Sequence, residues 1–182
     1  LPKLEMIPGC CGVKVFMGLS VGSLLVTDES DLNNIVSSIN NRASFHCEDQ
    51  DLLEERIEFQ IAGNINSHEV WRNDEQCFKA TKRIVNIARK NNKNIHILHV
   101  STGQEIEFLS RNKDVASVEI TPQHLTLSAP DCYDNLGSYA QMNPPIRDLS
   151  HQKKLWEGVN NGTADIIGSD HAPHTIEEKE NE

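Results

Sequence analysis

The chain has 182 residues, of which 37% are hydrophobic and 24% charged, an ordinary composition for one globular domain. Its formal net charge of −10 disfavours a nucleic-acid surface, which needs clustered Lys and Arg. No apolar run approaches the roughly 20 residues of a membrane helix, and the first residues do not read as a signal peptide. The five cysteines form no CxxC pair, which disfavours disulfides or a zinc knuckle and leads us to expect a cytoplasmic protein.

The predicted elements alternate between strands and helices along the chain. They are a strand at 12–17, a helix at 31–39, a strand at 43–47, helices at 51–61 and 75–90, a strand at 95–100, a helix from 102 to about 112, a strand at 115–121, a helix at 149–159 and a strand at 164–169. Thr102 and Glu105 predict a capping box at the start of their helix. A long loop is expected between 122 and 148.

This alternation predicts an α/β fold with a parallel sheet and right-handed crossovers. Two architectures remain open, a doubly wound sheet and part of a (β/α)8 barrel. No glycine-rich phosphate loop follows the first strand, which weakens the doubly wound dinucleotide-binding alternative. A whole barrel takes roughly 250 residues, so five strands would form only part of one.

Ionisable groups lie at or near the end of each predicted strand. The first strand carries Lys14, the second runs into His46, and the third ends at His99. The fourth leads to His124 and the last to Asp170. Because α/β proteins place their active sites at the carboxyl ends of the strands, we expect these groups to converge. Imidazoles and carboxylates so placed suit Zn²⁺ or a similar ion.

Several of these residues also have a purely structural explanation. Lys14 could be the outward-facing member of its strand, whereas a buried lysine loses its charge more readily, and its neutral amine can react with carbon dioxide to give a carbamate. His46 alone would more often be a hydrogen-bonded core histidine. Alternation places His96 and His99 on opposite faces, so we expect at most one ligand there, His99.

Asp170 is the hardest of these residues to explain structurally, because an acidic group directly follows an apolar strand. We therefore expect it to take part in metal binding or catalysis. His68, Arg72 and His151 show no comparable placement. We expect these three side chains to lie at the surface or in loops.

Six short motifs follow one another across nearly the whole chain. They are GVKVFMG at 12–18, HCED at 46–49, HILHVST at 96–102, EITPQHL at 119–125, MNPPIR at 142–147 and IGSDHAPHT at 167–175. Together they resemble the dihydroorotases, which are cyclic amidohydrolases of the amidohydrolase superfamily. The resemblance implies a partial (β/α)8 TIM-type barrel, with residues 1–182 forming a single incomplete barrel domain.

The resemblance also implies a site with one or two metal ions, usually zinc. Lys14 matches the carboxylated lysine that bridges the ions in many members, although some use an aspartate from this region instead. His46 and His99 match the histidines that bind the second ion. Asp170 matches the carboxylate that binds the first ion and acts as general base and acid.

On the substrate side, Asn143 and His174 match positions that contact the substrate. One family feature is absent, the His-x-His pair on the first strand and the arginine that follows it closely. We therefore expect the chain to be a fragment that lacks the N-terminal strand and the C-terminal part. A piece of barrel would expose sheet edges, so we expect it to be inactive alone.

The implied function is the reversible cyclisation of N-carbamoyl-L-aspartate to L-dihydroorotate in pyrimidine biosynthesis, by a zinc-dependent cyclic amide hydrolase acting on a small molecule. One alternative is an allantoinase or another cyclic amidase. A second alternative is a non-catalytic dihydroorotase-like partner of aspartate transcarbamoylase. The resemblance also makes a homodimer a reasonable expectation.

Overall fold

The fold is built on one parallel sheet. The computed structural model describes residues 2–18 and 24–180. Its strands are β1 (Val13–Phe16), β2 (Ala43–His46), β3 (Ile95–Ile97), β4 (Ala116–Ile120) and β5 (Ile166–Ile167). Each strand pairs in parallel with the next, in the order β1-β2-β3-β4-β5. This sequential order is that of a barrel wall, because a doubly wound sheet reverses its strand order part-way.

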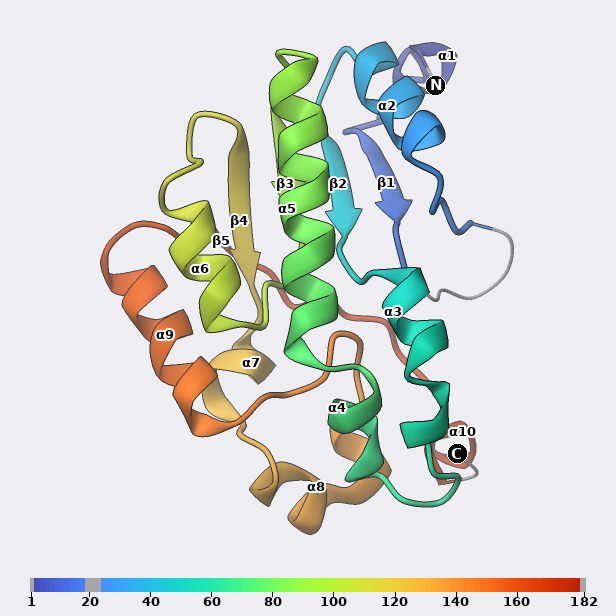
Figure 1. Cartoon of the computed structure of the whole chain (residues 1–182), viewed down its shortest axis with the longest axis vertical. Coiled ribbons are helices and arrows are strands. Elements are labelled where there is room, and N and C mark those ends of the chain that lie inside the picture. The colour runs from blue at the N-terminus through green and yellow to red at the C-terminus, as the bar shows by residue number, and fades with distance from the viewer. Residues whose placement is uncertain (1, 19–23, 181–182) are drawn as a thin grey trace.

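Helices precede and follow the strands, some over one face of the sheet and others beyond the carboxyl ends of the strands (Figure 1). They are α1 (Pro2–Glu5), α2 (Glu29–Ser38), α3 (Gln50–Glu55), α4 (Ser67–Trp71), α5 (Asp74–Lys90), α6 (Gly103–Leu109), α7 (Pro122–Thr126), α8 (Asp131–Leu136), α9 (Leu149–Asn160) and α10 (Ile176–Glu180), with the 3-10 helices η1 (Ile57–Phe59) and η2 (Gly137–Ala140). Helices α2, α5, α6 and α9 contact one another in that order. Within the described ranges, no helix has the length and apolar character needed to cross a bilayer.

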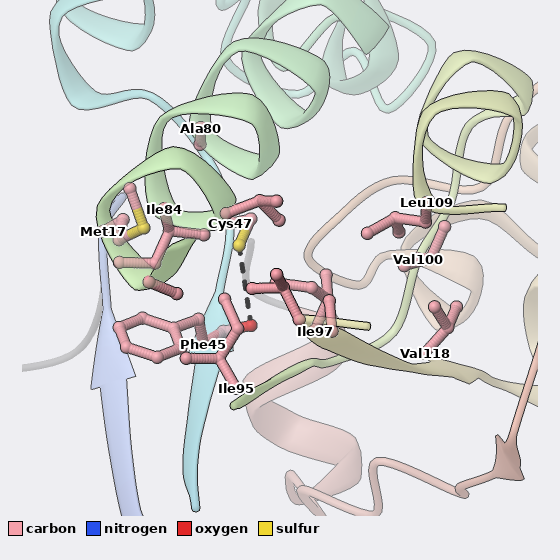
Figure 2. Packing of buried hydrophobic residues seen from close by; sticks show 14 of the residues in the cluster. Met17, Phe45, Cys47, Ala80, Ile84, Ile95, Ile97, Val100, Leu109 and Val118 are labelled. Carbon is pink, nitrogen blue, oxygen red and sulfur yellow. Dashed lines mark hydrogen bonds between the residues drawn. The ribbon is translucent and has the colours of Figure 1, made fainter. Parts of the chain in front are cut away.

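The face beneath these helices carries the apolar core (Figure 2). Val15, Phe45 and Ile97 contribute from three neighbouring strands, and Ala80 and Ile84 meet them from α5. All five side chains are at most 4% exposed. Full burial of such an aliphatic or aromatic side chain contributes about 1.5–3 kcal/mol each, which makes this layer the main stabilising element.

The opposite face of the sheet carries polar side chains. Lys14 is in register with Ser44, and Ser44 with His96. Registered residues of parallel strands point to the same side, so these three form a row across the sheet. One step nearer the carboxyl ends, Phe16 is in register with His46. The sheet therefore brings predicted site residues from separate strands to one face.

Most predicted elements are confirmed, with shifted limits. The predicted 51–61 helix is wrong as one element, because α3 ends at Glu55 and η1 follows it. The loop expected between 122 and 148 contains α7, α8 and η2. The last strand shrinks from 164–169 to Ile166–Ile167. All five cysteines are free, as predicted.

The predicted capping box is confirmed at the start of α6. The Thr102 hydroxyl accepts from the Glu105 backbone N–H at 3.2 Å, and the Glu105 carboxylate accepts from the Thr102 backbone N–H at 3.2 Å. The carboxylate also accepts from the Thr81 hydroxyl at 2.7 Å. Because both capping residues are buried, this box fixes the chain directly after His99.

Replacement of Thr102 by alanine should lower the free energy of unfolding by about 1–2 kcal/mol, because the α6 N-terminus loses its cap. Urea unfolding followed by far-UV circular dichroism measures this loss. Thr126→Ala is the matched control, since the exposed Thr126 hydroxyl only donates to the Pro122 carbonyl within α7. We expect the control to change stability by less than about 0.5 kcal/mol. Equal losses in the two variants would contradict the capping role.

Candidate metal centre

Two buried histidines meet at the carboxyl ends of β2 and β3. His46 is the last residue of β2, and His99 follows the end of β3 at Ile97. Nδ1 of His46 and Nε2 of His99 are 3.0 Å apart. The two rings meet edge to face, with centroids 4.7 Å apart. Two residues that the sequence singled out as metal ligands therefore lie side by side.

The backbone at His99 explains how its ring reaches this face. Its φ of +35° lies in the left-handed region, which is strained for a residue with a side chain. Alternation stops with the strand, so the expectation that His96 and His99 lie on opposite faces is wrong. Both contact Glu119, whose carboxylate lies 3.6 Å from His96 Nε2 and accepts the His99 backbone N–H at 3.2 Å.

His99 is held neutral. Burial lowers its pKa well below the usual value, and the nearby His46, His124 and Lys14 lower it further. Its Nδ1 is buried and has no hydrogen-bond partner among the described residues. A neutral imidazole keeps a ring-nitrogen lone pair, which is the form that binds a metal ion.

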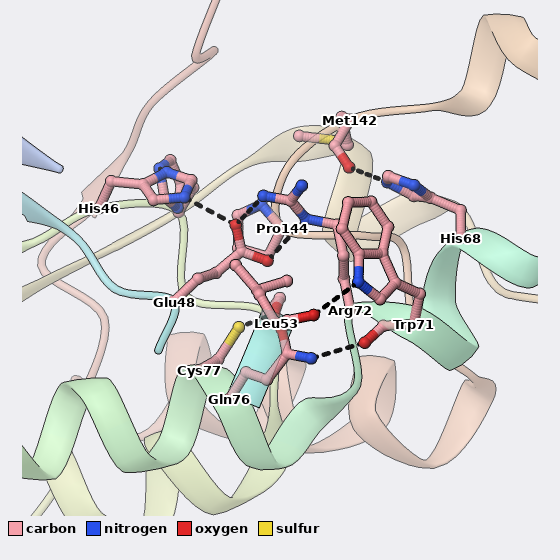
Figure 3. A network of polar contacts seen from close by, with 12 residues as sticks. His46, Glu48, Leu53, His68, Trp71, Arg72, Gln76, Cys77, Met142 and Pro144 are labelled. Atoms are coloured by element: carbon pink, nitrogen blue, oxygen red, sulfur yellow. Dashed lines mark hydrogen bonds and ion pairs between the residues drawn. The ribbon is translucent and has the colours of Figure 1, made fainter. Parts of the chain in front are cut away.

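Glu48 lies between His46 and Arg72 and contacts both (Figure 3). Oε2 of Glu48 lies 2.7 Å from Nε2 of His46. Arg72 donates to both carboxylate oxygens, from Nε to Oε1 at 3.0 Å and from Nη2 to Oε2 at 2.7 Å. Burial would raise the pKa of Glu48, but Arg72 and the His46 hydrogen bond outweigh it and hold this pKa well below the usual range. The ionised carboxylate only accepts, so His46 donates from Nε2 and keeps its Nδ1 lone pair toward His99.

Of the three residues expected at the surface or in loops, Arg72 lies in the turn between α4 and α5, whereas His68 lies in α4 and His151 in α9. Arg72 is 2% exposed and His68 7% exposed, so both belong to the interior. His151 is half-buried, and its Nδ1 accepts the Gly103 backbone N–H at 3.0 Å. Sequence reasoning did not single out Glu48. Its place in the HCED motif, two residues after His46, could have indicated a contact between the two side chains.

Two further buried histidines hold the segment around Asn143. Nε2 of His68 lies 3.0 Å from the Met142 carbonyl oxygen, and Nε2 of His124 lies 3.1 Å from that of Pro144. Both nitrogens donate, because a carbonyl oxygen can only accept. Asn143 is exposed between these two anchored carbonyls. The segment has no regular secondary structure here, so side-chain donors fix its position.

Lys14 lies on the same face of the sheet, and its side chain is exposed rather than buried. Its Nζ lies 4.7 Å from the centroid of the Phe16 ring, and that ring is 5.7 Å from the His46 ring. Its charge contributes to the lowered pKa of His99. Lys14 is therefore close enough to the histidine pair for its charge to act on His99.

The other predicted residues lie after β5 and in the loop before α9. Asp170 is half-buried and has a φ of +46°, a second left-handed residue at the predicted site. His174 is exposed, with Nδ1 3.6 Å from the Glu178 carboxylate. Within 2–18 and 24–180, no hydrogen bond or ion pair joins Asp170, Asn143 or His174 to the histidine pair.

The described residues fit part of a divalent-metal site. No three His, Cys, Asp or Glu side chains among them gather into a complete metal-binding group. Nδ1 of His46 and Nε2 of His99 nevertheless supply two facing imidazole nitrogens of the kind that bind zinc. The hydrogen bond from His46 to Glu48 is also typical of metal-binding histidines, which usually donate their other nitrogen to a carboxylate.

Comparison with known proteins gives the family. No family model matches the chain. A dihydroorotase from Methanosphaera stadtmanae is 33% identical over 174 residues, covering 92% of this chain and 39% of the relative. A dihydroorotase from Pyrococcus abyssi is 36% identical over 169 residues, covering 92% and 37%. The chain belongs to the dihydroorotase family. It spans less than two fifths of the length of these two dihydroorotases.

Solved structures agree on the fold. The L-hydantoinase (dihydropyrimidinase) from Arthrobacter aurescens matches 92% of this chain and 39% of its own, with a TM-score of 0.85 and 25% identity. A D-hydantoinase at 22% identity matches 96% of this dihydroorotase-family chain and 40% of its own, with a TM-score of 0.84, and supports the fold alone. The predicted partial TIM-type barrel of the amidohydrolase type is therefore confirmed.

The anchoring histidines predict how stability depends on pH. Burial lowers the pKa of His68 and of His124 from 6.5 to about 4, which outweighs the carbonyl that each contacts. The unfolded chain therefore binds more protons than the folded chain between these values, and stability falls as the pH falls. From pH 7 to pH 5 we expect a loss of about 2 kcal/mol per histidine.

Urea unfolding of the chelator-treated protein at pH 7 and pH 5 measures this loss. The amide of His124→Gln can still donate to the Pro144 carbonyl but does not titrate, so this variant should show a smaller loss. His174→Gln is the control, since the exposed His174 should leave the pH dependence unchanged. An unaltered pH dependence in His124→Gln would refute the assignment.

Proposed function

We propose that the protein is a dihydroorotase, which interconverts N-carbamoyl-L-aspartate and L-dihydroorotate in pyrimidine biosynthesis. The observation that carries the proposal is the buried pair of His46 and His99, whose ring nitrogens face each other at 3.0 Å where β2 and β3 end. The relatives named dihydroorotase support the choice of substrate, at 33% and 36% identity over 92% of the chain.

His46 and His99 would hold a zinc ion, with one or two ions in the whole site. Lys14, once carboxylated, would bridge the ions, and Asp170 would supply a further ligand. When bound, a zinc ion lowers the pKa of a water molecule to about 7 and polarises a carbonyl group. The neutral state of His99 supports this assignment, because a protonated imidazole cannot bind a metal.

Asp170 would move the proton in both directions of the reaction. During hydrolysis, the water oxygen bonds to the ring carbonyl carbon while the Asp170 carboxylate takes the water proton. Asp170 then delivers this proton to the ring nitrogen as the carbon–nitrogen bond breaks. The half-buried carboxylate has no hydrogen bond or ion pair within the described part of the chain, which supports such an exchange.

Asn143 and His174 would hold the carboxylate and the ring of the substrate. Anchoring of the Met142 and Pro144 carbonyls by buried histidines supports a fixed position for Asn143. The net charge of −10 does not attract an anionic substrate over long distances. Attraction would therefore come from local cations and hydrogen-bond donors.

A second candidate is another cyclic amidase, including an allantoinase. The specific observation in its favour is the likeness to the L-hydantoinase (dihydropyrimidinase), at 25% identity. A non-catalytic partner of aspartate transcarbamoylase is disfavoured, since Lys14, His46, His99 and Asp170 are all present. A homodimer and an association with aspartate transcarbamoylase are further proposals for the whole protein.

The full-length protein should hydrolyse L-dihydroorotate in preference to allantoin, hydantoin and dihydrouracil when zinc and bicarbonate are supplied. Asp170→Asn should lower kcat for dihydroorotate by about 10²–10⁴-fold, because proton transfer is lost. Asp131→Asn is the control, since this exposed carboxylate lies in α8 and should leave kcat unchanged. Preference for another cyclic amide would favour the second candidate, and near-normal turnover by Asp170→Asn would reject the general-base role.

Lys14→Ala should lose bound zinc, because the bridging ligand is gone. Metal content measured by mass spectrometry checks this, and added short carboxylic acids should restore part of the activity. Lys82→Ala is the matched control, since Lys82 is an exposed lysine whose Nζ lies 4.2 Å from the Phe78 ring centroid. Full zinc content in Lys14→Ala would refute the bridging role.

A further inference from the structure

Glu48 and Arg72 form an ion pair inside the protein, and packing of the apolar core gives no reason for two charges to be buried there. Glu48 is fully buried, and Arg72, 24 residues further along the chain, is 2% exposed. Removal of two charges from water costs several kcal/mol per ion, so such a pair is weak evidence of stabilisation by itself. Its third partner is His46, through the 2.7 Å contact with Glu48. The location of the pair therefore points to a role at the histidine site.

The donors and acceptors around Glu48 define that role. Arg72 has only donors, and its fork occupies one position on each oxygen of Glu48. The same Oε2 also lies 2.7 Å from His46 Nε2. A carboxylate held by a guanidinium fork has no proton to give, so His46 must donate from Nε2. Its Nδ1 then carries the lone pair, and this is the atom that faces His99 Nε2 at 3.0 Å.

The surroundings leave the pair little freedom. A Cβ atom on Gly18 would lie 2.6 Å from the Cβ of Glu48, so the end of the GVKVFMG motif packs tightly on this residue. The Arg72 backbone N–H donates to the His68 carbonyl at 2.9 Å, and its own carbonyl accepts from Arg147 Nη1. The Trp71 ring centroid lies 5.1 Å from the guanidinium carbon. Arg72 is thus fixed on several sides while it holds Glu48.

We propose that Glu48 and Arg72 are positioning residues that set the tautomer and orientation of His46, so that its Nδ1 lone pair would be available to a metal ion. This role rests on the metal centre of the proposed function. It does not depend on which cyclic amide is the substrate. A merely structural ion pair would join β2 to α4 without affecting zinc binding.

The test compares zinc dissociation constants in the full-length protein, measured by competition with a chromophoric chelator. In Glu48→Gln the amide oxygen should turn to Arg72 and the amide NH2 to His46, which moves the histidine proton to Nδ1. We expect the dissociation constant to rise about 10–100-fold. Arg72→Lys keeps the charge but loses the fork, so we expect a smaller rise.

Asp114→Asn is the matched control, because Asp114 also accepts both arms of an arginine fork, from Arg89 at 2.6 and 3.0 Å, and contacts neither His46 nor His99. It should leave the zinc dissociation constant unchanged. A second readout is the ¹⁵N chemical shift of His46 in the metal-free protein, which should report a proton on Nε2 in the wild type and on Nδ1 in Glu48→Gln.

Wild-type affinity for zinc in Glu48→Gln, or an unchanged His46 tautomer, would overturn the proposal. A wild-type protein that binds zinc but leaves dihydroorotate intact would refute the proposed substrate, and the zinc comparison would still decide the role of Glu48. A wild-type protein that binds no zinc would overturn both.

Discussion

A carboxylate removed from water needs a donor for each of its oxygens, and Glu48 meets this need with His46 on one side and Arg72 on the other. The constraint acts on both partners. Arg72 must remain buried beside α4, and His46 must present its protonated nitrogen to Glu48. This orientation of the His46 ring decides which of its nitrogens is left to face His99.

The fold could be predicted from the sequence wherever a short-range pattern decides the structure. The amphipathic spacing of 75–90 produced α5, and Thr102 with Glu105 produced the capping box. The 51–61 helix was misjudged because its apolar positions continue beyond Glu55 while the backbone tightens into η1. The short helix α7 begins with a Thr cap and a proline and is only five residues long. It is too short to show a helical spacing of apolar residues, so that spacing could not predict it.

The sequence singled out the two facing histidines of the candidate site but not the residues that hold them. Strand ends and motifs indicated His46 and His99, and the parallel sheet brings them together. Arg72 gave no local signal, because a single arginine before a polar helix start is most often exposed, and its partner lies 24 residues away. Alternation also misplaced His96 relative to His99, since it assumes a regular strand, and φ at His99 is +35°.

The same buried polar cluster also reaches the predicted substrate side. Arg72 accepts from Arg147 through its carbonyl, and Arg147 ends the segment whose first carbonyls are held by His68 and His124. The loop that carries Asn143 has no ladder of backbone hydrogen bonds to define it, so its position depends on these side-chain donors. These contacts therefore connect the histidine pair with the segment that carries Asn143. A change at Arg72 would disturb the support of His46 and the support of Asn143 together, whereas a change at His68 or His124 would first release one carbonyl of the loop.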